Sequence, residues 1–159
     1  MSSAFLRLGY DKPASQYRRF LSEQERGERD VLVAFVDGEF AGYATIVWRS
    51  GYGPFYSENV PEIKDLNVLF RFRRRGVATR LMDEAEGLVF EKSLTTGIGV
   101  GMTLDYGAAE RRYVKHGYMP DGRSLMSPGK PVEYGKPVVI DDDLVLYFTK
   151  DPTRQTPAF

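Results

Sequence analysis

Three consecutive arginines, Arg73 to Arg75, stand directly before Gly76, and this run is the clearest candidate ligand site in the sequence. Downstream of the glycine, apolar residues recur every three or four positions, which is the period of an amphipathic helix. A helix N-terminus has unpaired backbone N–H groups and a partial positive charge, so arginines there oppose helix stability. A bound anion would compensate for them, and glycine lets the backbone approach that anion closely. The spacing therefore predicts an anion site where the helix begins.

The same basic run has other interpretations that the whole-chain charge helps to weigh. A solvated basic cluster, a nucleic-acid contact or a localisation signal could all use three arginines. The chain has 22 Lys plus Arg and 22 Asp plus Glu, which give a formal net charge of +0. Since no basic field surrounds the arginines, we expect no nucleic-acid partner and favour a local anion pocket.

Length and composition limit the class of protein. With 159 residues we expect one domain over residues 1–150 and a loose tail over 151–159. The sequence has no cysteine and one histidine, His116, so thiolate and histidine-rich metal sites are excluded and we predict no metal. No apolar run reaches the length of a membrane span, and no signal pattern opens the chain. We expect a soluble, cytoplasmic protein with no membrane partner.

The elements that must position the anion site follow from hydrophobic periodicity and turn residues. Helices are expected over 14–26, 77–92 and 106–116, and strands over 4–8, 31–36, 40–48, 63–69, 97–104, 118–122 and 143–149. Asp37-Gly38 predicts a hairpin turn between two of these strands. Residues 50–61 and 123–139 are expected to be irregular. The order indicates a mixed α/β sheet with helices on its faces.

Two segments have compositions that leave their role open. The loop over 50–61 contains Tyr52, Phe55 and Tyr56, which could line a ligand mouth or fold onto the core. In the strand over 97–104, glycine alternates with Ile98, Val100, Met102 and Leu104, so apolar side chains share one face and glycines the other. Something must lie close to the glycine face, either a tightly packed helix or an elongated ligand.

Two short motifs occur in order along the chain. The first is Arg73 to Ala78, which follows a strand and opens a helix, and the second is Ala109-x-x-x-Tyr113 followed by Gly117-Tyr118. They resemble the Gln/Arg-x-x-Gly-x-Gly/Ala and Ala-x-x-x-Tyr motifs of the GNAT superfamily of acetyl-CoA-dependent N-acetyltransferases. The resemblance covers residues 31–149. It implies an α/β (α+β) fold, a single domain with a mixed, mostly antiparallel twisted sheet, a central splayed parallel strand pair and helices on both faces.

The resemblance also implies how acetyl-CoA would be held. The pantetheine arm would pair with the backbone around Leu66 and Val68, and the pyrophosphate would bind the amides of the basic turn. Tyr106, which stands where many members have asparagine, and Ala109 would complete the cofactor contacts. The full set of implied cofactor-binding residues is Leu66, Val68, Arg73, Arg74, Arg75, Gly76, Val77, Ala78, Thr79, Tyr106 and Ala109.

Acetyl transfer to an amine needs a base and an acid. A primary amine is mostly protonated at neutral pH, and the resemblance implies that Glu62 takes this proton, with Asp65 or ordered water as the alternatives. Strand alternation is expected to put Asp65 on the face opposite Glu62. A leaving thiolate has an ordinary pKa near 8.5, so a tyrosine with a pKa near 10 can protonate it. Tyr113 matches the family tyrosine in this role, whereas His116 is expected to be a packed or solvated residue.

The favoured function is therefore transfer of acetyl from acetyl-CoA to the amine of a small-molecule acceptor in a ternary complex. Glu58, Glu62 and residues 141–143 are expected to gather at the mouth and attract a cationic amine. The alternatives are acetylation of a peptide or protein N-terminus or lysine, and a non-catalytic acyl-CoA-binding sensor. Because many members pair, the resemblance also suggests a homodimer.

Overall fold

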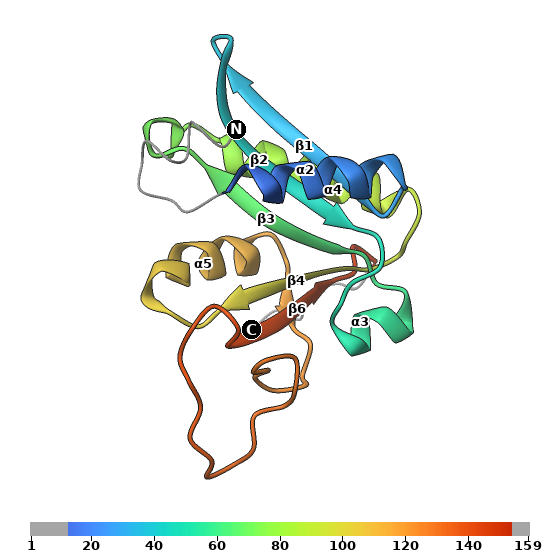
Figure 1. The fold of residues 1–159 in the computed structure, drawn as a ribbon, viewed down its shortest axis with the longest axis vertical. Coiled ribbons are helices and arrows are strands. Elements are labelled where there is room, and N and C mark those ends of the chain that lie inside the picture. The colour runs from blue at the N-terminus through green and yellow to red at the C-terminus, as the bar shows by residue number, and fades with distance from the viewer. Residues whose placement is uncertain (1–12, 154–159) are drawn as a thin grey trace.

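The computed structural model describes residues 13–153, which form a six-stranded sheet with helices packed on it (Figure 1). The elements in chain order are α2 (Ala14–Glu25), β1 (Arg29–Val36), β2 (Glu39–Val47), α3 (Gly53–Glu58), β3 (Glu62–Val68), η1 (Phe70–Phe72), α4 (Val77–Phe90), β4 (Thr96–Gly101), η2 (Leu104–Tyr106), α5 (Gly107–Lys115), β5 (Met119–Pro120) and β6 (Val145–Lys150). The strand expected over 4–8 and the end of the expected tail, 154–159, lie outside the described residues.

The sheet order is β1-β2-β3-β4-β6-β5, and β3–β4 is its parallel pair. The other pairs are antiparallel. The hairpin between β1 and β2 turns at Asp37 and Gly38, whose φ angles of 52° and 77° suit a two-residue turn with both central residues left-handed. This mixed, mostly antiparallel sheet with one central parallel pair confirms the predicted fold class.

Helices cover both faces of the sheet. On one face, α2 buries Tyr17 and Phe20 against Tyr43 of β2. On the other face, α4 buries Met82 in a cluster with Ile63 of β3. Helix α5 joins this second cluster through a buried tyrosine, and the two clusters account for most of the apolar core. Within residues 13–153, no helix is both long and apolar enough to cross a membrane.

Two sequence-based expectations of local structure are wrong. The segment over 50–61 is not wholly irregular, because residues 53–58 form α3, in which Pro54 is at the first turn, where a missing N–H costs nothing. Strand β4 ends at Gly101, where its pairing with β6 also ends, and Leu104 begins a 3-10 turn and is 99% exposed. Leu104 therefore does not share the buried face of Ile98 and Val100.

Candidate active site

The turn that precedes α4 leaves backbone donors free, as the sequence predicts. Gly76 is the N-cap residue with φ 77°, Arg74 is also left-handed with φ 61°, and no side chain caps the helix. Within residues 13–153, the backbone N–H groups of residues 77–79 have no hydrogen-bond acceptor. The first turn of α4 has no acidic residue either. Unpaired donors and the helix dipole together make this turn suited to an anion.

The arginines of the turn differ in what they contact. Arg71, in η1, pairs with Glu39 over 2.5 Å, and Arg75 lies 3.4 Å from Asp37 of the hairpin turn. Arg74 has no partner among the residues that the structure describes. Two of the basic side chains are thus tied to the hairpin, while Arg74 remains available to a ligand.

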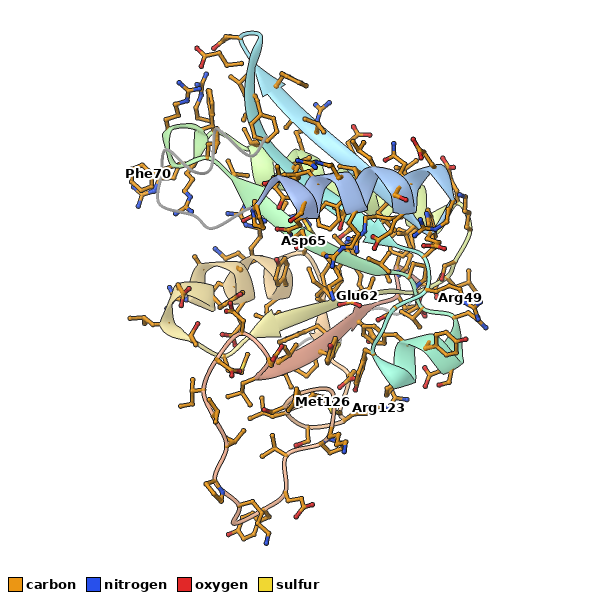
Figure 2. The ribbon with its side chains drawn as sticks, viewed as in Figure 1. Arg49, Glu62, Asp65, Phe70, Arg123 and Met126 are labelled. Atoms are coloured by element: carbon orange, nitrogen blue, oxygen red, sulfur yellow. The ribbon has the colours of Figure 1, made fainter. Side chains whose placement is uncertain are left out.

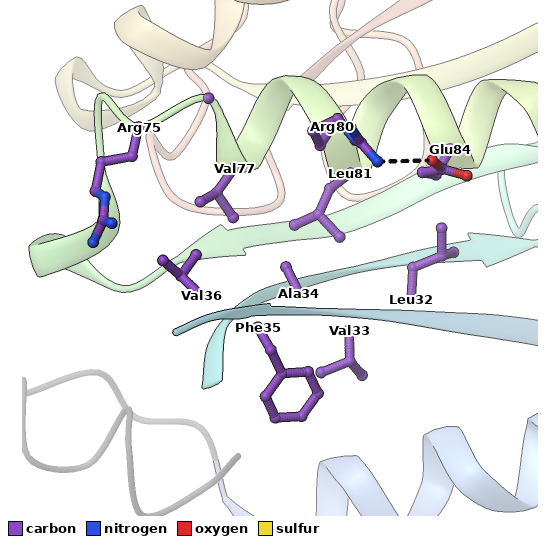
Figure 3. Close-up of a pocket in the computed structure, with 11 residues that line it drawn as sticks. Leu32, Val33, Ala34, Phe35, Val36, Arg75, Val77, Arg80, Leu81 and Glu84 are labelled. Carbon is purple, nitrogen blue, oxygen red and sulfur yellow. Dashed lines mark ion pairs between the residues drawn. The ribbon is translucent and has the colours of Figure 1, made fainter. Parts of the chain in front are cut away.

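An apolar groove of about 370 Å³ runs beside this turn, between β1 and the first half of α4 (Figure 3). Aliphatic side chains form most of its lining, among them Leu32, Ala34 and Leu81. Arg75 forms one end of the groove, and Arg80 pairs with Glu84 along its wall over 3.7 Å. The groove therefore adds a mostly apolar surface next to the turn that precedes α4.

Strands β3 and β4 pair only where they begin and then diverge (Figure 1). Glu62 of β3 lies opposite Gly97 of β4, and the Gly97 N–H donates to the Pro61 carbonyl over 2.8 Å. Beyond this point the two strands do not pair, so the edge of β3 that faces β4 is unpaired at Leu66 and Val68. Unpaired strand edges bind extended chains by main-chain hydrogen bonds, so this edge could hold an elongated ligand.

Glu62 is buried at the point where the two strands part (Figure 2). Its side chain accepts a hydrogen bond from the Ser50 hydroxyl over 2.5 Å, and Lys64 lies 3.5 Å from its other oxygen. The carboxylate also faces Gly99 of β4, since a Cβ at that glycine would lie 3.5 Å from Glu62 Oε1. Glu62 is thus a buried acidic group on the glycine face of the sheet, next to the diverging strands.

Asp65 lies on the same face as Glu62, and the prediction that strand alternation separates them is wrong. The register with β2 shifts between Thr45, opposite Lys64, and Tyr43, opposite Asn67, so β3 has one extra residue there. Asp65 is in this bulge, with φ 54°. Its carboxylate lies 3.3 Å from both the Thr45 hydroxyl and an Arg29 nitrogen. The bulge redirects the side chain toward Arg29, so Asp65 is already committed to an ion pair.

Tyr147 of β6 lies among acidic side chains, and sequence reasoning expected Glu62 and Asp143 there but missed Tyr147 itself and Asp121. Burial and the charges of Glu62, Asp121 and Asp143 raise the pKa of Tyr147 to about 12. Its ring stacks on Tyr52 at 3.7 Å, and the Tyr52 hydroxyl donates to Asp121 over 2.8 Å. Glu62 begins β3, Asp143 lies in a turn, and Tyr52 and Asp121 lie in loops. No sequence motif connects these four residues.

Of the acidic residues expected at the mouth, only some contribute to this group. The charges of Glu62 and Asp143 raise the pKa of Tyr147, whereas Glu58 pairs with Arg123 on the surface. Asp142 accepts a hydrogen bond from the Tyr106 hydroxyl over 3.2 Å.

The glycine face of β4 is covered by aromatic rings of the chain itself. A Cβ at Gly97 would lie 2.1 Å from the Phe55 ring of α3, and one at Gly101 would lie 2.7 Å from the Tyr106 ring. Close packing, including that of a helix, therefore explains the glycines. Tyr52 and Phe55 likewise fold onto the core, whereas Tyr56 stays exposed beside Arg49.

Tyr113 lies on the other face of the sheet from Glu62. It projects from α5 into the cluster that contains Ile98 and Val100, whose side chains alternate with the glycines of β4. Burial raises the pKa of Tyr113 to about 12, so the phenol keeps its proton at neutral pH. Ala109, one turn earlier, is packed against the same cluster. A group held between β3 and β4 would therefore have Glu62 on one side and the tyrosine helix on the other.

Comparison with known sequences supports one family. The profile described as "Acetyltransferase (GNAT) family" matches residues 3–118. A search of curated proteins found no match.

Solved structures with this fold span most of the chain. A ribosomal-protein-alanine N-acetyltransferase from Brucella melitensis has a TM-score of 0.63 at 19% identity and covers 90% of this chain and 81% of its own. An N-acetyltransferase from Staphylococcus aureus Mu50 has a TM-score of 0.66 at 17% identity, with coverages of 89% and 79%. The PaiA N-acetyltransferase from Thermoplasma acidophilum, in complex with coenzyme A, has a TM-score of 0.61 at 14% identity, with coverages of 86% and 70%. These likenesses establish the shared fold.

Proposed function

Because the chain belongs to the GNAT acetyltransferase family and is an acyltransferase, we propose that it acetylates the amine of a small, cationic acceptor with acetyl-CoA. The amine nitrogen attacks the thioester carbon, the C–S bond breaks, and the products are an N-acetylated amine and the coenzyme A thiol. The observation that carries the acceptor class is that two carboxylates lie beside Tyr147. A Cβ at Gly99 would lie 3.5 Å from Glu62 Oε1 and 3.0 Å from the Tyr147 ring, and the Asp121 N–H donates to the Tyr147 carbonyl over 2.9 Å.

The residues around the α4 turn suit a pyrophosphate. The free N–H groups of residues 77–79, the left-handed Gly76 and the unpartnered Arg74 would bind its oxygens. The unpaired edge at Leu66 and Val68 would bind an extended amide-containing arm. When bound, acetyl-CoA supplies the activated thioester. The residues of this chain would position acetyl-CoA, accept the proton of the amine and donate a proton to the leaving sulfur.

Glu62 is proposed as the base that takes the ammonium proton. It is buried at the point where β3 and β4 part, one of its oxygens accepts the Ser50 hydroxyl, and the other pairs with the exposed Lys64 over 3.5 Å. Asp65, the competing carboxylate, is already engaged by Arg29 and Thr45. A positioned base of this kind contributes roughly 10²–10⁴-fold to the rate.

Tyr113 is proposed as the donor to the leaving sulfur. Its pKa of about 12 keeps the phenol protonated across the pH range in which amines are acetylated, so the O–H is available as charge develops on sulfur. Tyr113 lies on the face of the sheet opposite Glu62. This position supports a mechanism in which the base and the acid approach the thioester from opposite sides of the diverging strands β3 and β4.

The carboxylates of Glu62 and Asp143, together with Asp121, whose charge Arg123 partly offsets at 3.9 Å, favour a cationic acceptor over a neutral one. At partly buried sites the attraction between opposite charges is stronger than in bulk water, so a second ammonium group on the acceptor would gain from this cluster. Glu58 does not contribute, because Arg123 pairs with it. We therefore expect small diamines, polyamines or amino sugars to be better acceptors than neutral monoamines.

A thiol-release assay with acetyl-CoA and a panel of amines and peptides tests this function. The chain has no cysteine, so any thiol detected comes from coenzyme A. We expect turnover of small cationic amines, a loss of about 10²–10⁴-fold in kcat for Glu62→Gln, and little change for the surface control Glu58→Gln. Turnover only on peptides would contradict the small-molecule acceptor. Tight coenzyme A binding without acetylation of any amine would instead support a sensor.

A further inference from the structure

Asp83, Glu86 and His116 form a second polar cluster, between α4 and the end of α5. Asp83 and Glu86 are three residues apart on α4 and therefore project from the same side of the helix. His116 is the C-cap residue of α5, and its Nδ1 lies 3.9 Å from both Asp83 Oδ1 and Glu86 Oε1. The ligand-type atoms of the three residues all lie within 4.8 Å of one another. The active-site chemistry proposed above uses none of these side chains.

Glu86 carries the decisive observation, because one of its oxygens is buried without a partner. The residue is 7% exposed, and its Oε2 accepts a hydrogen bond from Lys150 Nζ over 2.5 Å. Its Oε1 has no hydrogen-bond partner among the described residues and lies 3.9 Å from His116 Nδ1. A buried carboxylate oxygen left unsatisfied is costly, because nothing replaces the hydrogen bonds that it would make to water. A ligand at this point would remove that cost.

We propose that Asp83, Glu86 and His116 bind a divalent transition-metal ion such as Zn²⁺. One imidazole nitrogen and two carboxylate oxygens are a common ligand set for this ion, and water would complete a tetrahedral shell. Bond lengths of about 2.0–2.2 Å put the ligand atoms of a tetrahedral site roughly 3.4 Å apart. The two 3.9 Å separations from His116 must therefore shorten by roughly 0.5 Å, and the separation between the two carboxylates, which is within 4.8 Å, by at most roughly 1.4 Å. The Asp83 side chain, 57% exposed, is free to make that movement.

The charges of the site also favour a cation. Two carboxylates outweigh the single Lys150 ammonium, so with a neutral imidazole the site has a net charge of about −1. The metal would connect α4, which carries the anion turn, with α5, which carries Tyr113. Its expected role is to hold these two helices together. A chain with one histidine cannot form a histidine-rich cluster, but a mixed site needs only the one histidine present.

The test uses the full chain without an affinity tag and adds Zn²⁺ alone. Because His116 is the only histidine, its imidazole gives one set of NMR signals, and we expect Zn²⁺ to shift them in proportion to occupancy. We expect Tm to rise by several degrees at about a hundredfold excess over Kd. Asp83→Asn and His116→Asn should weaken Zn²⁺ binding at least about tenfold and remove the rise in Tm.

Glu84→Gln is the matched control, because Glu84 is the neighbouring exposed acid of α4 and pairs with Arg80. It should bind Zn²⁺ as the wild type does. Retained coenzyme A binding by the Asp83 and His116 variants would confirm that they are folded. Unshifted His116 signals in the wild type, or equal Zn²⁺ affinity in the wild type and both variants, would overturn the site. Neither result depends on whether an amine is acetylated.

Discussion

The Ser50 hydroxyl donates a hydrogen bond to Glu62 Oε2 over 2.5 Å, and both side chains are buried where β3 and β4 begin to diverge. The same hydroxyl oxygen accepts the Tyr52 N–H over 3.0 Å. One serine therefore links the proposed base to the start of α3, whose Phe55 covers the glycine face of β4. The orientation of Glu62 depends on a residue twelve positions away.

Ser50→Ala should impair catalysis more than cofactor binding. Without the hydroxyl, the carboxylate loses its donor and can rotate, so we expect kcat to fall by about tenfold, a loss typical of a supporting residue around a functional group. The Kd for coenzyme A, measured by calorimetry, should be unchanged. Ser57→Ala, on the exposed side of α3, is the control and should leave kcat unchanged. An unaltered kcat in Ser50→Ala would show that this hydrogen bond does not support the base.

Arg74→Ala should weaken coenzyme A binding more than Arg71→Ala. Arg74 lacks a partner among the described residues, whereas Arg71 is paired with Glu39. Loss of a charge-assisted hydrogen bond costs about 1.5–3 kcal/mol, so we expect the Kd to rise roughly tenfold to a hundredfold for Arg74→Ala. Calorimetry at two salt concentrations provides the measurement, and the difference should shrink at high salt. Equal effects of the two substitutions would argue against the assignment of the turn.

Gly42→Ala should destabilise the fold, while Gly87→Ala should stabilise it. A Cβ at Gly42 would lie 2.4 Å from the Asn67 carbonyl oxygen, which is backbone of the β3 bulge and cannot move aside. Overpacking of this kind costs about 1–3 kcal/mol. Gly87 is exposed within α4 with nothing within 4 Å, so alanine there should gain up to about 1 kcal/mol from helix propensity. Urea denaturation of both variants gives the free energies of unfolding.

Stability should fall at alkaline pH through the buried tyrosines. The pKa of Tyr113 is raised by burial from 10 to about 12, so the folded state holds the phenolic proton more tightly than the unfolded state. The stability from this group is complete below about pH 10 and is lost as the pH rises toward 12. Tyr113→Phe should therefore flatten the decrease in the free energy of unfolding between pH 10 and 12. An identical pH dependence in this variant would exclude the contribution.

The sequence by itself determined the family, the order of most elements and the glycine turn that opens α4. These follow from local signals: helical periodicity after Gly76, the Asp37-Gly38 turn, and two short motifs with fixed spacing. Local signals suffice here because helix starts and tight turns depend on a few adjacent residues.

The tertiary structure alone decided which side chains meet. The bulge at Asp65 puts its side chain on the face of the sheet opposite to the one expected. One added residue in β3 shifts the alternation of side chains, and the composition of the strand does not indicate it. The grouping of Asp121 and Asp143 around Tyr147, and of Asp83 with His116, joins residues far apart in the sequence. Such contacts arise from how the sheet and helices pack, and periodicity along the chain has no information about them.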